Sequence, residues 1–332
     1  MTLSTSNSSP DPVSQESGID FVVLWVDGDA PEHRAKRQAF LSSDIGCKPD
    51  DEEQSIDNLR FIQTSELRYC LRSIKYHAPW YRKIWLVTDS QIPSFLESKK
   101  LFKDRIEIVD HKAIFSGNEK YLPTFNTRSI VSLIDKIPGL SQKFIYGNDD
   151  FMLGGNVAPD FFFKQGLPVI YGDWVSHTAE IKPTLFQQGM MNAAKMLGFP
   201  SHSFINISHG FQPMDRQIIE TLRDKFPAQF TNNLAHKFRH RSQFLLESLH
   251  NHYCYRHKNV ETSGTELMVH FSFQLCREGE AEKIKFLFDL FRQNKRKMFC
   301  INEYQSLYPR LPFVKSDLEA LCGPPLVSEL AL

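Results

Sequence analysis

The stretch "KFIYGNDDFMLGG", residues 143–155, decides the fold of this chain. An apolar run leads into two adjacent carboxylates, Asp149 and Asp150, and a Gly-Gly turn follows them. A strand that is buried on both faces should be apolar throughout, so acids at its carboxyl end either face solvent in a turn or hold a positive charge. By itself, this motif supports a polar turn and a divalent-cation site equally.

Three earlier apolar runs end in the same way. They are IDFVVLWVDG at 19–28, KIWLVTD at 83–89 and RIEIVDH at 105–111. The segments at 65–79 and 127–139 have the periodicity of amphipathic helices. Strands that alternate with helices form a parallel α/β sheet, whose ligands bind at the carboxyl ends of the strands. We therefore predict that the acids at these strand ends form one set.

The second half of the chain has a different pattern. Longer helical patterns follow residue 175 and predict a helical region packed on the sheet. Nothing in the sequence resembles a flexible linker between the halves, so we predict one composite domain. The predicted parts are a disordered polar tail at 1–18, a domain at 19–305 with an α/β half (19–175) and a helical half (176–305), and a C-terminal tail at 306–332.

Composition excludes several classes of protein. Lys plus Arg and Asp plus Glu number 39 each, so net charge does not favour a nucleic-acid partner. The six cysteines form no CxxC pair, and the amino terminus lacks the pattern of a secretion signal. No stretch has the roughly 20 apolar residues that span a bilayer. We therefore expect a cytoplasmic protein. The basic run at 292–297 is interpreted as a solvated helix face, with peripheral contact at the inner face of the plasma membrane as the alternative.

Other charged residues suit phosphoryl transfer. Asp27 follows the first strand and precedes a helical pattern. This order favours a strand–loop–helix unit over a hairpin, and such a unit offers backbone N–H groups to an anion. In the second half, "ISHGFQPMDRQ" contains His209 and Arg216, and "AHKFRHRSQF" contains Arg239. Phosphoryl transfer needs cations against the phosphate oxygens and a base for the attacking hydroxyl. Taken singly, each of these residues is more often an ordinary surface residue.

A series of motifs in order along the chain carries a family resemblance. They include "IDFVVLWVDGDAPEHR", "ELRYCLRSIKYHAPWYRKIWLVTDSQIPSFL", "YLPTFNTRSIVSLIDKIPGLSQKFIYGNDDFMLGG", "SHGFQPMDRQIIETLRDKFPAQF" and "FCINE". From about residue 19 to 305 the sequence resembles the Stealth family. That family comprises bacterial capsular and exopolysaccharide sugar-phosphate transferases and the catalytic subunit of the lysosomal-enzyme N-acetylglucosamine-1-phosphotransferase. The resemblance implies a glycosyltransferase-A-like α/β core that binds a nucleotide sugar.

The resemblance also implies a reaction. Hexose-1-phosphate, often N-acetylhexosamine-1-phosphate, passes from a UDP-sugar to a sugar hydroxyl, which forms a phosphodiester in a surface glycan and releases UMP. The implied cofactor is a divalent cation, Mg²⁺ or Mn²⁺, and the implied acceptor is a glycan or lipid-linked glycan. Two alternatives stay open: a glycosyltransferase on the same fold that releases UDP, and an inactive glycan-binding module.

The resemblance, carried over residue by residue, gives three groups of candidate site residues. His209 is the base for the acceptor hydroxyl, Arg239 stabilises charge on the transferred phosphoryl, and Asp27 contacts the donor or its metal. Asp149, Asp150 and Glu303 are the expected metal ligands, and Asp150 is also counted with the catalytic residues. The expected substrate-binding residues are Glu66, Arg68, Arg72, Asn126, Asn148 and Asn302, together with Arg216, which we add for its charge.

The sequence departs from the family pattern at a few positions. Gln63 and Thr64 stand where the family usually has Asp-Asn, and Arg128 stands where a His is frequent. Glu303 replaces an Asp and keeps the carboxylate with one extra methylene. We expect the first two departures to affect the choice of donor or acceptor.

Overall fold

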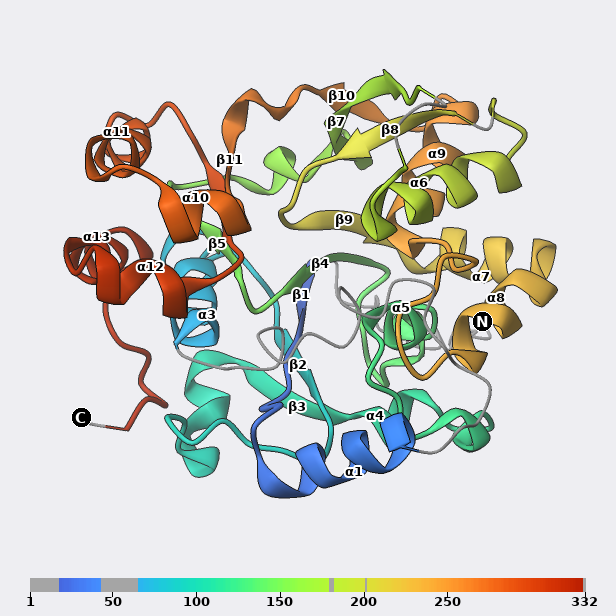
Figure 1. The fold of residues 1–332 in the computed structure, drawn as a ribbon, viewed down its shortest axis with the longest axis horizontal. Helices are drawn as coiled ribbons and strands as arrows, with labels where there is room; N and C mark the ends of the chain where they lie inside the picture. Colours follow the sequence, from blue (N-terminus) through green and yellow to red (C-terminus); the bar gives the residue numbers. More distant parts are fainter. Residues whose placement is uncertain (1–17, 43–64, 179–181, 201, 331–332) are drawn as a thin grey trace, which may run out of the picture.

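A five-stranded sheet forms the centre of the protein, shown in Figure 1 for a computed structural model that describes residues 18–42, 65–178, 182–200 and 202–330. The strand order is β3-β2-β1-β4-β9. The first four of these strands run parallel, and β9 is antiparallel to β4. Their bounds are β1 Asp20–Leu24, β2 Ile84–Thr88, β3 Ile106–Asp110, β4 Lys143–Asn148 and β9 Gln212–Asp215. The predicted α/β class with a mostly parallel sheet is confirmed.

The order of the strands reverses at β1. The chain moves outward from β1 to β2 and β3, and then returns to place β4 on the other side of β1. Open α/β sheets bind ligands at such a reversal, outside the carboxyl ends of the two strands. The parallel register pairs Leu24 with Asn148, so β1 and β4 end side by side.

Successive strand residues point to opposite faces of this sheet, so apolar side chains lie on both faces, and helices cover both. Phe21 and Val23 of β1 pack in the same core cluster as Leu67 and Leu71 of α3 (Glu66–His77). Val22 and Leu24 face a second cluster. That cluster includes residues of α5 (Thr127–Val131), α7 (Arg216–Lys225), α8 (Pro227–Ala235) and α9 (Leu246–Arg256). Figure 1 shows α3 on one side of β1 and β4 and α5 on the other. Both faces are therefore closed to ligands.

The second half contains more strands than the sequence analysis predicted. A small sheet has the order β10-β7-β6, with β8 also paired to β7, and α6 (Leu185–Met196) packs nearby. These strands are β6 Phe163–Lys164, β7 Leu167–Ser176, β8 Ser203–Ile207 and β10 Glu261–Ser263. The prediction of a helical half at 176–305 is therefore corrected, because β9 even joins the central sheet.

A third sheet joins the last part of the chain to the turn after β4. It has the order β11-β12-β5, with β5 at Phe151–Leu153, β11 at Met268–Phe271 and β12 at Met298–Ile301. The surrounding helices are α10 Phe273–Glu278, α11 Ala281–Arg292, α12 Tyr304–Arg310 and α13 Phe313–Cys322. Residues 306–332, assigned to a tail from the sequence, thus contain most of α12 and all of α13, whose Leu307, Val314 and Leu318 are buried in a core cluster.

The remaining elements are the 12-residue helix α1, a short helix and several 3₁₀ turns. They are α1 Pro31–Ser42, α4 His111–Ile114, and 3₁₀ turns at Ser98–Asp104, Glu119–Tyr121, Ile134–Lys136, Pro159–Phe161 and Thr265–Leu267. Within the described residues, no helix is both long enough and apolar enough to span a membrane.

Two buried histidines attach α9 to neighbouring strands. Nε2 of His250 accepts a hydrogen bond from the backbone N–H of Asp215, and Nε2 of His252 accepts one from Ile205. Neither side chain is exposed to solvent. Burial lowers the pKa of each imidazole to about 4 from 6.5. Both rings must therefore be neutral in the folded protein.

We expect acid to destabilise the protein through these two rings. The unfolded chain binds their protons below about pH 6.5 and the folded chain only below about pH 4, so the stability is lost as the pH falls between these values. At about 1.4 kcal/mol per pH unit, each ring should remove about 2 kcal/mol from the free energy of unfolding between pH 7 and pH 5.

Urea unfolding of wild type and His250→Gln at pH 7 and pH 5 tests this. The glutamine can still accept the hydrogen bond but cannot titrate, so its loss of stability should be smaller by about 2 kcal/mol. His257→Gln, at an exposed position after the same helix, should keep the wild-type pH dependence. Equal pH dependence in wild type and His250→Gln would contradict the assignment.

Candidate active site

The turn between β4 and β5 carries Asn148, Asp149 and Asp150, all half-buried. Oδ2 of Asp150 accepts a hydrogen bond from Sγ of Cys300 at 3.3 Å. Oδ1 of Asp150 is buried and has no hydrogen-bond partner among the described residues. Burial raises the pKa of Asp150 to about 6, helped by the carboxylate of Glu66 and opposed by the thiol and Arg239. The Asp150 carboxylate therefore has an incomplete set of partners.

The third sheet places its own side chains against this turn. Cys300 of β12 lies opposite Phe151 in the antiparallel pair, and the backbone N–H of Ile301 donates to the carbonyl of Asp150. Sγ of Cys300 also lies 3.2 Å from Oδ1 of Asn302. The side chain of Asn302 in turn hydrogen-bonds His270 at the end of β11. Asn302, a predicted site residue, thus lies at the turn with two residues that were not predicted.

His209 reaches the same place from the loop between β8 and β9. Gly147 of β4 makes room for this loop, since a Cβ there would lie 2.5 Å from the buried ring of Phe211. The ring of His209 stacks between Phe186 and His270, with centroid separations of 4.4 and 4.2 Å. Burial, His270 and Arg239 together lower the pKa of His209 to about 3. The imidazole is therefore neutral and can accept a proton.

Arg239 enters from the segment after α8. Nη2 of Arg239 donates to Oγ1 of Thr127 at 3.2 Å. The guanidinium interacts electrostatically with Tyr146, Asp150 and Glu247. A cation held beside the acid turn can balance the charge of an anionic ligand there.

Asn126 supports this segment and does not face a ligand, contrary to its assignment as a substrate-binding residue. Its side chain is fully buried, and Nδ2 donates to the carbonyls of His236 and Phe238 and to Oε1 of Gln243. Its Oδ1 accepts from the backbone N–H of Arg128. These contacts use the hydrogen-bonding capacity of the amide, so Asn126 positions the segment that carries Arg239.

Arg68 and Arg72 are also removed from the site. Arg72 makes two hydrogen bonds to the carboxylate of Glu329, and Arg68 lies 3.7 Å from the same carboxylate. Arg72 and Glu329 are both largely buried. The predicted substrate-binding role of this pair is corrected, because the two cations bind the end of the described chain to α3.

Arg216 lies at the opposite end of the central sheet. The antiparallel pairing places Asp215 beside Lys143 at the start of β4, and Nη1 of Arg216 donates to the carbonyl of Leu140. Five strand residues, or about 16 Å, separate Lys143 from Asn148. The predicted contact of Arg216 with substrate is therefore corrected.

Asp27 and Glu303 have largely structural contacts. Oδ1 of Asp27 accepts from the backbone N–H groups of Asp29 and Ala30, so it shapes the loop that follows β1 at the correct edge of the sheet. The carboxylate of Glu303 is buried, and it pairs with Arg277 and accepts from Oγ of Ser306. In this structure Glu303 thus has structural contacts, and its role as a metal ligand stays a prediction.

The turn itself fits a hard divalent cation. Asp150 offers an oxygen that is buried and has no described partner, and Asp149 lies next to it in the chain. Mg²⁺ and Mn²⁺ prefer such oxygen ligands and use few protein carboxylates. The residues of the turn that would hold the ion are therefore Asp149 and Asp150.

Several residues of the site were missed by the sequence analysis. Tyr146 lies two residues before Asn148, and its hydroxyl donates to Oδ1 of Asn148 at 3.1 Å. Glu247 is buried on α9 near Arg239. The position of Tyr146 on β4, close to Asn148, could have indicated that it belongs to the candidate site. The other missed residues, Glu247, His270 and Cys300, come from distant segments whose pairing the sequence pattern does not show.

The departures from the family pattern have different outcomes. Gln63 and Thr64 lie outside the described residues. Arg128 is buried and donates to the carbonyls of His240 and Leu185. It therefore joins Asn126 in holding the segment that carries Arg239.

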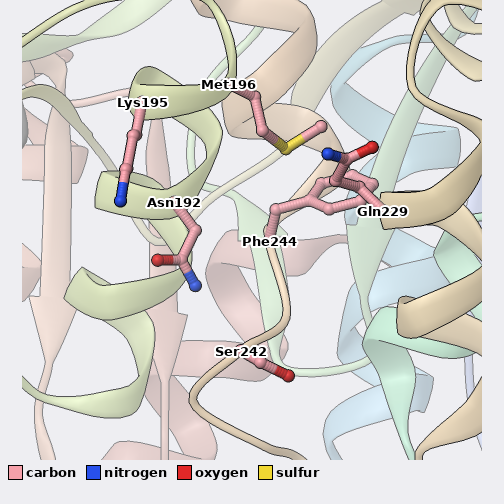
Figure 2. Close-up of a pocket in the computed structure, with 6 residues that line it drawn as sticks. All are labelled: Asn192, Lys195, Met196, Gln229, Ser242 and Phe244. Atoms are coloured by element: carbon pink, nitrogen blue, oxygen red, sulfur yellow. The ribbon is translucent and has the colours of Figure 1, made fainter.

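A hollow of about 350 Å³ lies apart from this turn, between α6 and α8 (Figure 2). Its lining residues are Asn192, Lys195, Met196, Gln229, Ser242 and Phe244. Nδ2 of Asn192 donates to the carbonyls of Arg241 and Gln243, which fixes one wall. The lining contains no carboxylate or imidazole, so we place the candidate chemistry at the Asp149–Asp150 turn.

Comparisons with known proteins agree with the family resemblance. Residues 60–169 match the family model described as Stealth protein CR2, conserved region 2, and residues 208–256 match Stealth protein CR3, conserved region 3. Together these matches contain Asn148, Asp149, Asp150, His209 and Arg239. The predicted resemblance is confirmed.

Curated relatives carry names that refer to polysaccharide phosphotransferases. A Streptomyces coelicolor protein named an exopolysaccharide phosphotransferase is 35% identical over 71% of this chain and 25% of its own length. A second one from the same organism is 32% identical over 87% of this chain and 47% of its own length. A Haemophilus influenzae protein named a capsular polysaccharide phosphotransferase is 29% identical over 87% of this chain and 79% of its own length. The chain thus spans a quarter to a half of the first two relatives.

A solved galactosyltransferase structure, LgtC with donor and acceptor sugar analogues, aligns with 92% of this chain and 98% of its own. The sequence identity is 9% and the TM-score is 0.43. At these values the similarity carries no argument about function.

The incomplete pairing of Asp150 generates a prediction about stability. Asp150→Asn should raise the melting temperature of the metal-free protein slightly or leave it unchanged, because the substitution removes a buried charge with an unsatisfied oxygen. The same variant should weaken Mn²⁺ binding at least about tenfold, since it removes a charged ligand. Thermal unfolding and Mn²⁺ titration followed by electron paramagnetic resonance measure the two effects.

Asp135→Asn is the matched control. Asp135 is fully buried, and its carboxylate pairs with Arg223. Its substitution should lower the melting temperature, because it leaves Arg223 without its partner, and it should leave Mn²⁺ binding unchanged. A large destabilisation by Asp150→Asn with unaltered Mn²⁺ binding would show that Asp150 is structural.

Proposed function

Because this chain is a Stealth-type protein that carries conserved regions 2 and 3 of that family, we propose that it is a sugar-phosphate transferase. The proposed reaction moves hexose-1-phosphate, in the first instance N-acetylhexosamine-1-phosphate, from a UDP-sugar to a sugar hydroxyl. The product is a phosphodiester in a capsular polysaccharide or exopolysaccharide, and UMP leaves.

One observation supports this proposal more than any other. A pair of carboxylates, a neutral imidazole and a guanidinium come from distant parts of the chain to the turn after β4. Asp150 and Arg239 interact electrostatically, as do Arg239 and His209. Transfer of a phosphoryl group requires this combination. A bound cation and a positively charged side chain must lie beside the phosphate oxygens, and a base must lie beside the attacking hydroxyl.

Each residue has a defined task in the proposed reaction. His209 accepts the proton of the acceptor hydroxyl as its oxygen forms a bond to the β-phosphorus of the donor. The bond from that phosphorus to the oxygen that bridges it to the α-phosphorus breaks, and UMP leaves with this oxygen. Arg239 balances the negative charge on the transferred phosphoryl group.

The environment of His209 explains how it can act as a base. Its pKa is about 3 because burial, His270 and Arg239 oppose a positive charge on the ring. A bound diphosphate brings negative charge to the same place and raises that pKa toward neutrality. The lone pair of His209 is therefore available at the start, and proton transfer becomes favourable when the donor is bound.

Asp149 and Asp150 would hold the divalent cation. When bound, Mg²⁺ or Mn²⁺ supplies positive charge against the diphosphate oxygens. We further propose a glycan or lipid-linked glycan as acceptor, with the reaction at the cytoplasmic face of the plasma membrane.

The fate of the β-phosphorus tests the reaction. A UDP-sugar labelled with ³²P at the β-position is incubated with the protein, Mg²⁺ and a glycan acceptor. The proposal predicts that the label enters the glycan and that the nucleotide product is unlabelled UMP. A glycosyltransferase would leave the label in UDP, and this result would overturn the proposal.

Variants test the two catalytic assignments in the same assay. His209→Ala should lower kcat by about 10²- to 10⁴-fold, as expected for loss of a general base. Arg239→Lys should also lower kcat, because a lysine keeps the charge but not the planar fork. His257→Ala, at the exposed position after α9, is the control and should retain wild-type kcat. A loss of less than about tenfold in His209→Ala would remove His209 as the base.

A further inference from the structure

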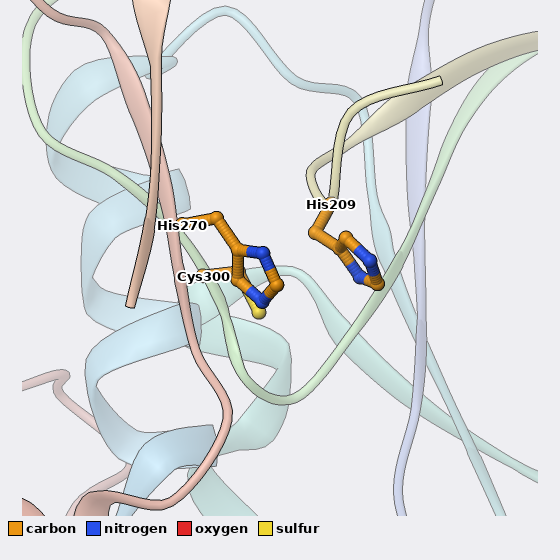
Figure 3. Close-up of side chains that lie close together, drawn as sticks. All are labelled: His209, His270 and Cys300. Atoms are coloured by element: carbon orange, nitrogen blue, oxygen red, sulfur yellow. The ribbon is translucent and has the colours of Figure 1, made fainter. Parts of the chain in front are cut away.

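Three side chains near the Asp149–Asp150 turn form a second set of possible ligands. One ligand atom each from His209, His270 and Cys300 lies within 4.8 Å of the other two. Figure 3 shows the two imidazoles side by side, with the sulfur beneath the ring of His270. Imidazole nitrogen and thiolate sulfur suit Zn²⁺ and related ions, whereas Mg²⁺ prefers oxygen. This set therefore differs in chemistry from the carboxylates of the turn.

The register of the third sheet fixes two members of the set. His270 of β11 is paired directly with Cys300 of β12 in a parallel ladder. Paired residues point to the same face of a sheet, with their Cβ atoms about 5 Å apart. The backbone therefore holds the two side chains next to each other on one face of the sheet.

The third member is held by ring contacts. Phe186 covers one face of the His209 ring, and His270 covers the other. His209 is also the proposed base for the transfer reaction. A metal that takes the lone pair of His209 would remove its capacity to accept a proton.

We propose that His209, His270 and Cys300 bind one zinc-class divalent cation, and that this ion inhibits the transfer reaction by occupying His209. The binding part of the proposal stands on the three ligands alone. The inhibitory part rests on the proposed function of His209. Three protein ligands would leave a fourth position for water, as in sites that release their metal or use it.

The site requires the His270 ring to rotate out of its stack with His209, and it requires the loss of one proton. A tetrahedral zinc ion with bonds of about 2.0–2.3 Å needs its ligands about 3.3–3.8 Å apart, so the donors must approach by about 1 Å. His270 is exposed and can turn toward the ion. The S–H bond of Cys300 breaks as the sulfur binds the metal, and the proton is released to solvent.

Cobalt binding by the whole chain tests the site. Co²⁺ is added to the protein with Mg²⁺ in large excess, and the absorption spectrum is recorded. We expect one equivalent to bind and to give a thiolate-to-cobalt charge-transfer band. Cys300→Ser should abolish this band and weaken Co²⁺ binding at least about tenfold, and His270→Ala should weaken binding to a similar extent while the band is kept.

Matched controls exclude other thiols and general damage. Cys276 is buried like Cys300, and its Sγ donates to the carbonyl of Phe271. Cys276→Ser should retain both the band and the affinity for Co²⁺. A cobalt complex without a thiolate band, or a band that persists in Cys300→Ser, would overturn the proposed site.

Inhibition by zinc completes the test. In the assay of the β-phosphorus, Zn²⁺ at one equivalent should stop transfer in the presence of excess Mg²⁺, and a chelator should restore it. Transfer with no cobalt site would contradict the zinc-class site and leave the proposed reaction intact. A cobalt site in a protein that releases UDP would support the zinc-class site and overturn the proposed reaction. The two proposals can therefore fail separately.

Discussion

The parallel pairing of β1 with β4 is the constraint on which the rest of the structure depends. It closes both faces of the sheet, because alternate residues of β1 enter two separate cores, and so polar groups can gather only at the strand ends. At the amino end, Asp20 accepts from Arg82, Trp85 and the backbone of Ser141. At the carboxyl end, Oδ1 of Asp150 has no described partner. The first carboxylate stabilises the fold, and the second is suited to a ligand.

Sequence periodicity was sufficient to predict the central strands, but it was insufficient to predict the third sheet. Four apolar runs that end in acids identify parallel strands because burial on both faces permits few other residues. By contrast, β11 and β12 are short, and 26 residues separate Phe271 from Met298. Their pairing, which brings His270 to Cys300, has no local signal. The sequence thus predicted the acids of the candidate site and missed the imidazole of His270 and the thiol of Cys300 beside them.

Two residues that the family resemblance assigns to substrate binding have structural contacts in this protein. Asn126 and Arg72 were predicted to bind substrate, but the amide of Asn126 is used within the protein and Arg72 makes a two-bond ion pair with Glu329. A buried amide or guanidinium with satisfied donors cannot also bind a ligand without leaving its partners unpaired. Asn126 acts at a distance from the chemistry, because it holds the segment that carries Arg239. Such a role depends on partners more than one hundred residues away, and the sequence pattern does not supply them.

The partner of Asp150 bears on the cation site that we propose at the turn. Elsewhere the protein pairs some of its buried acids with arginine, as Glu303 with Arg277 and Asp135 with Arg223. An arginine paired in this way with Asp150 would stabilise the turn, but it would occupy both oxygens and exclude a metal. Cys300 donates a weaker hydrogen bond to one oxygen and leaves the other available. The thiol therefore orients the carboxylate without neutralising it, which keeps the negative charge that a cation requires.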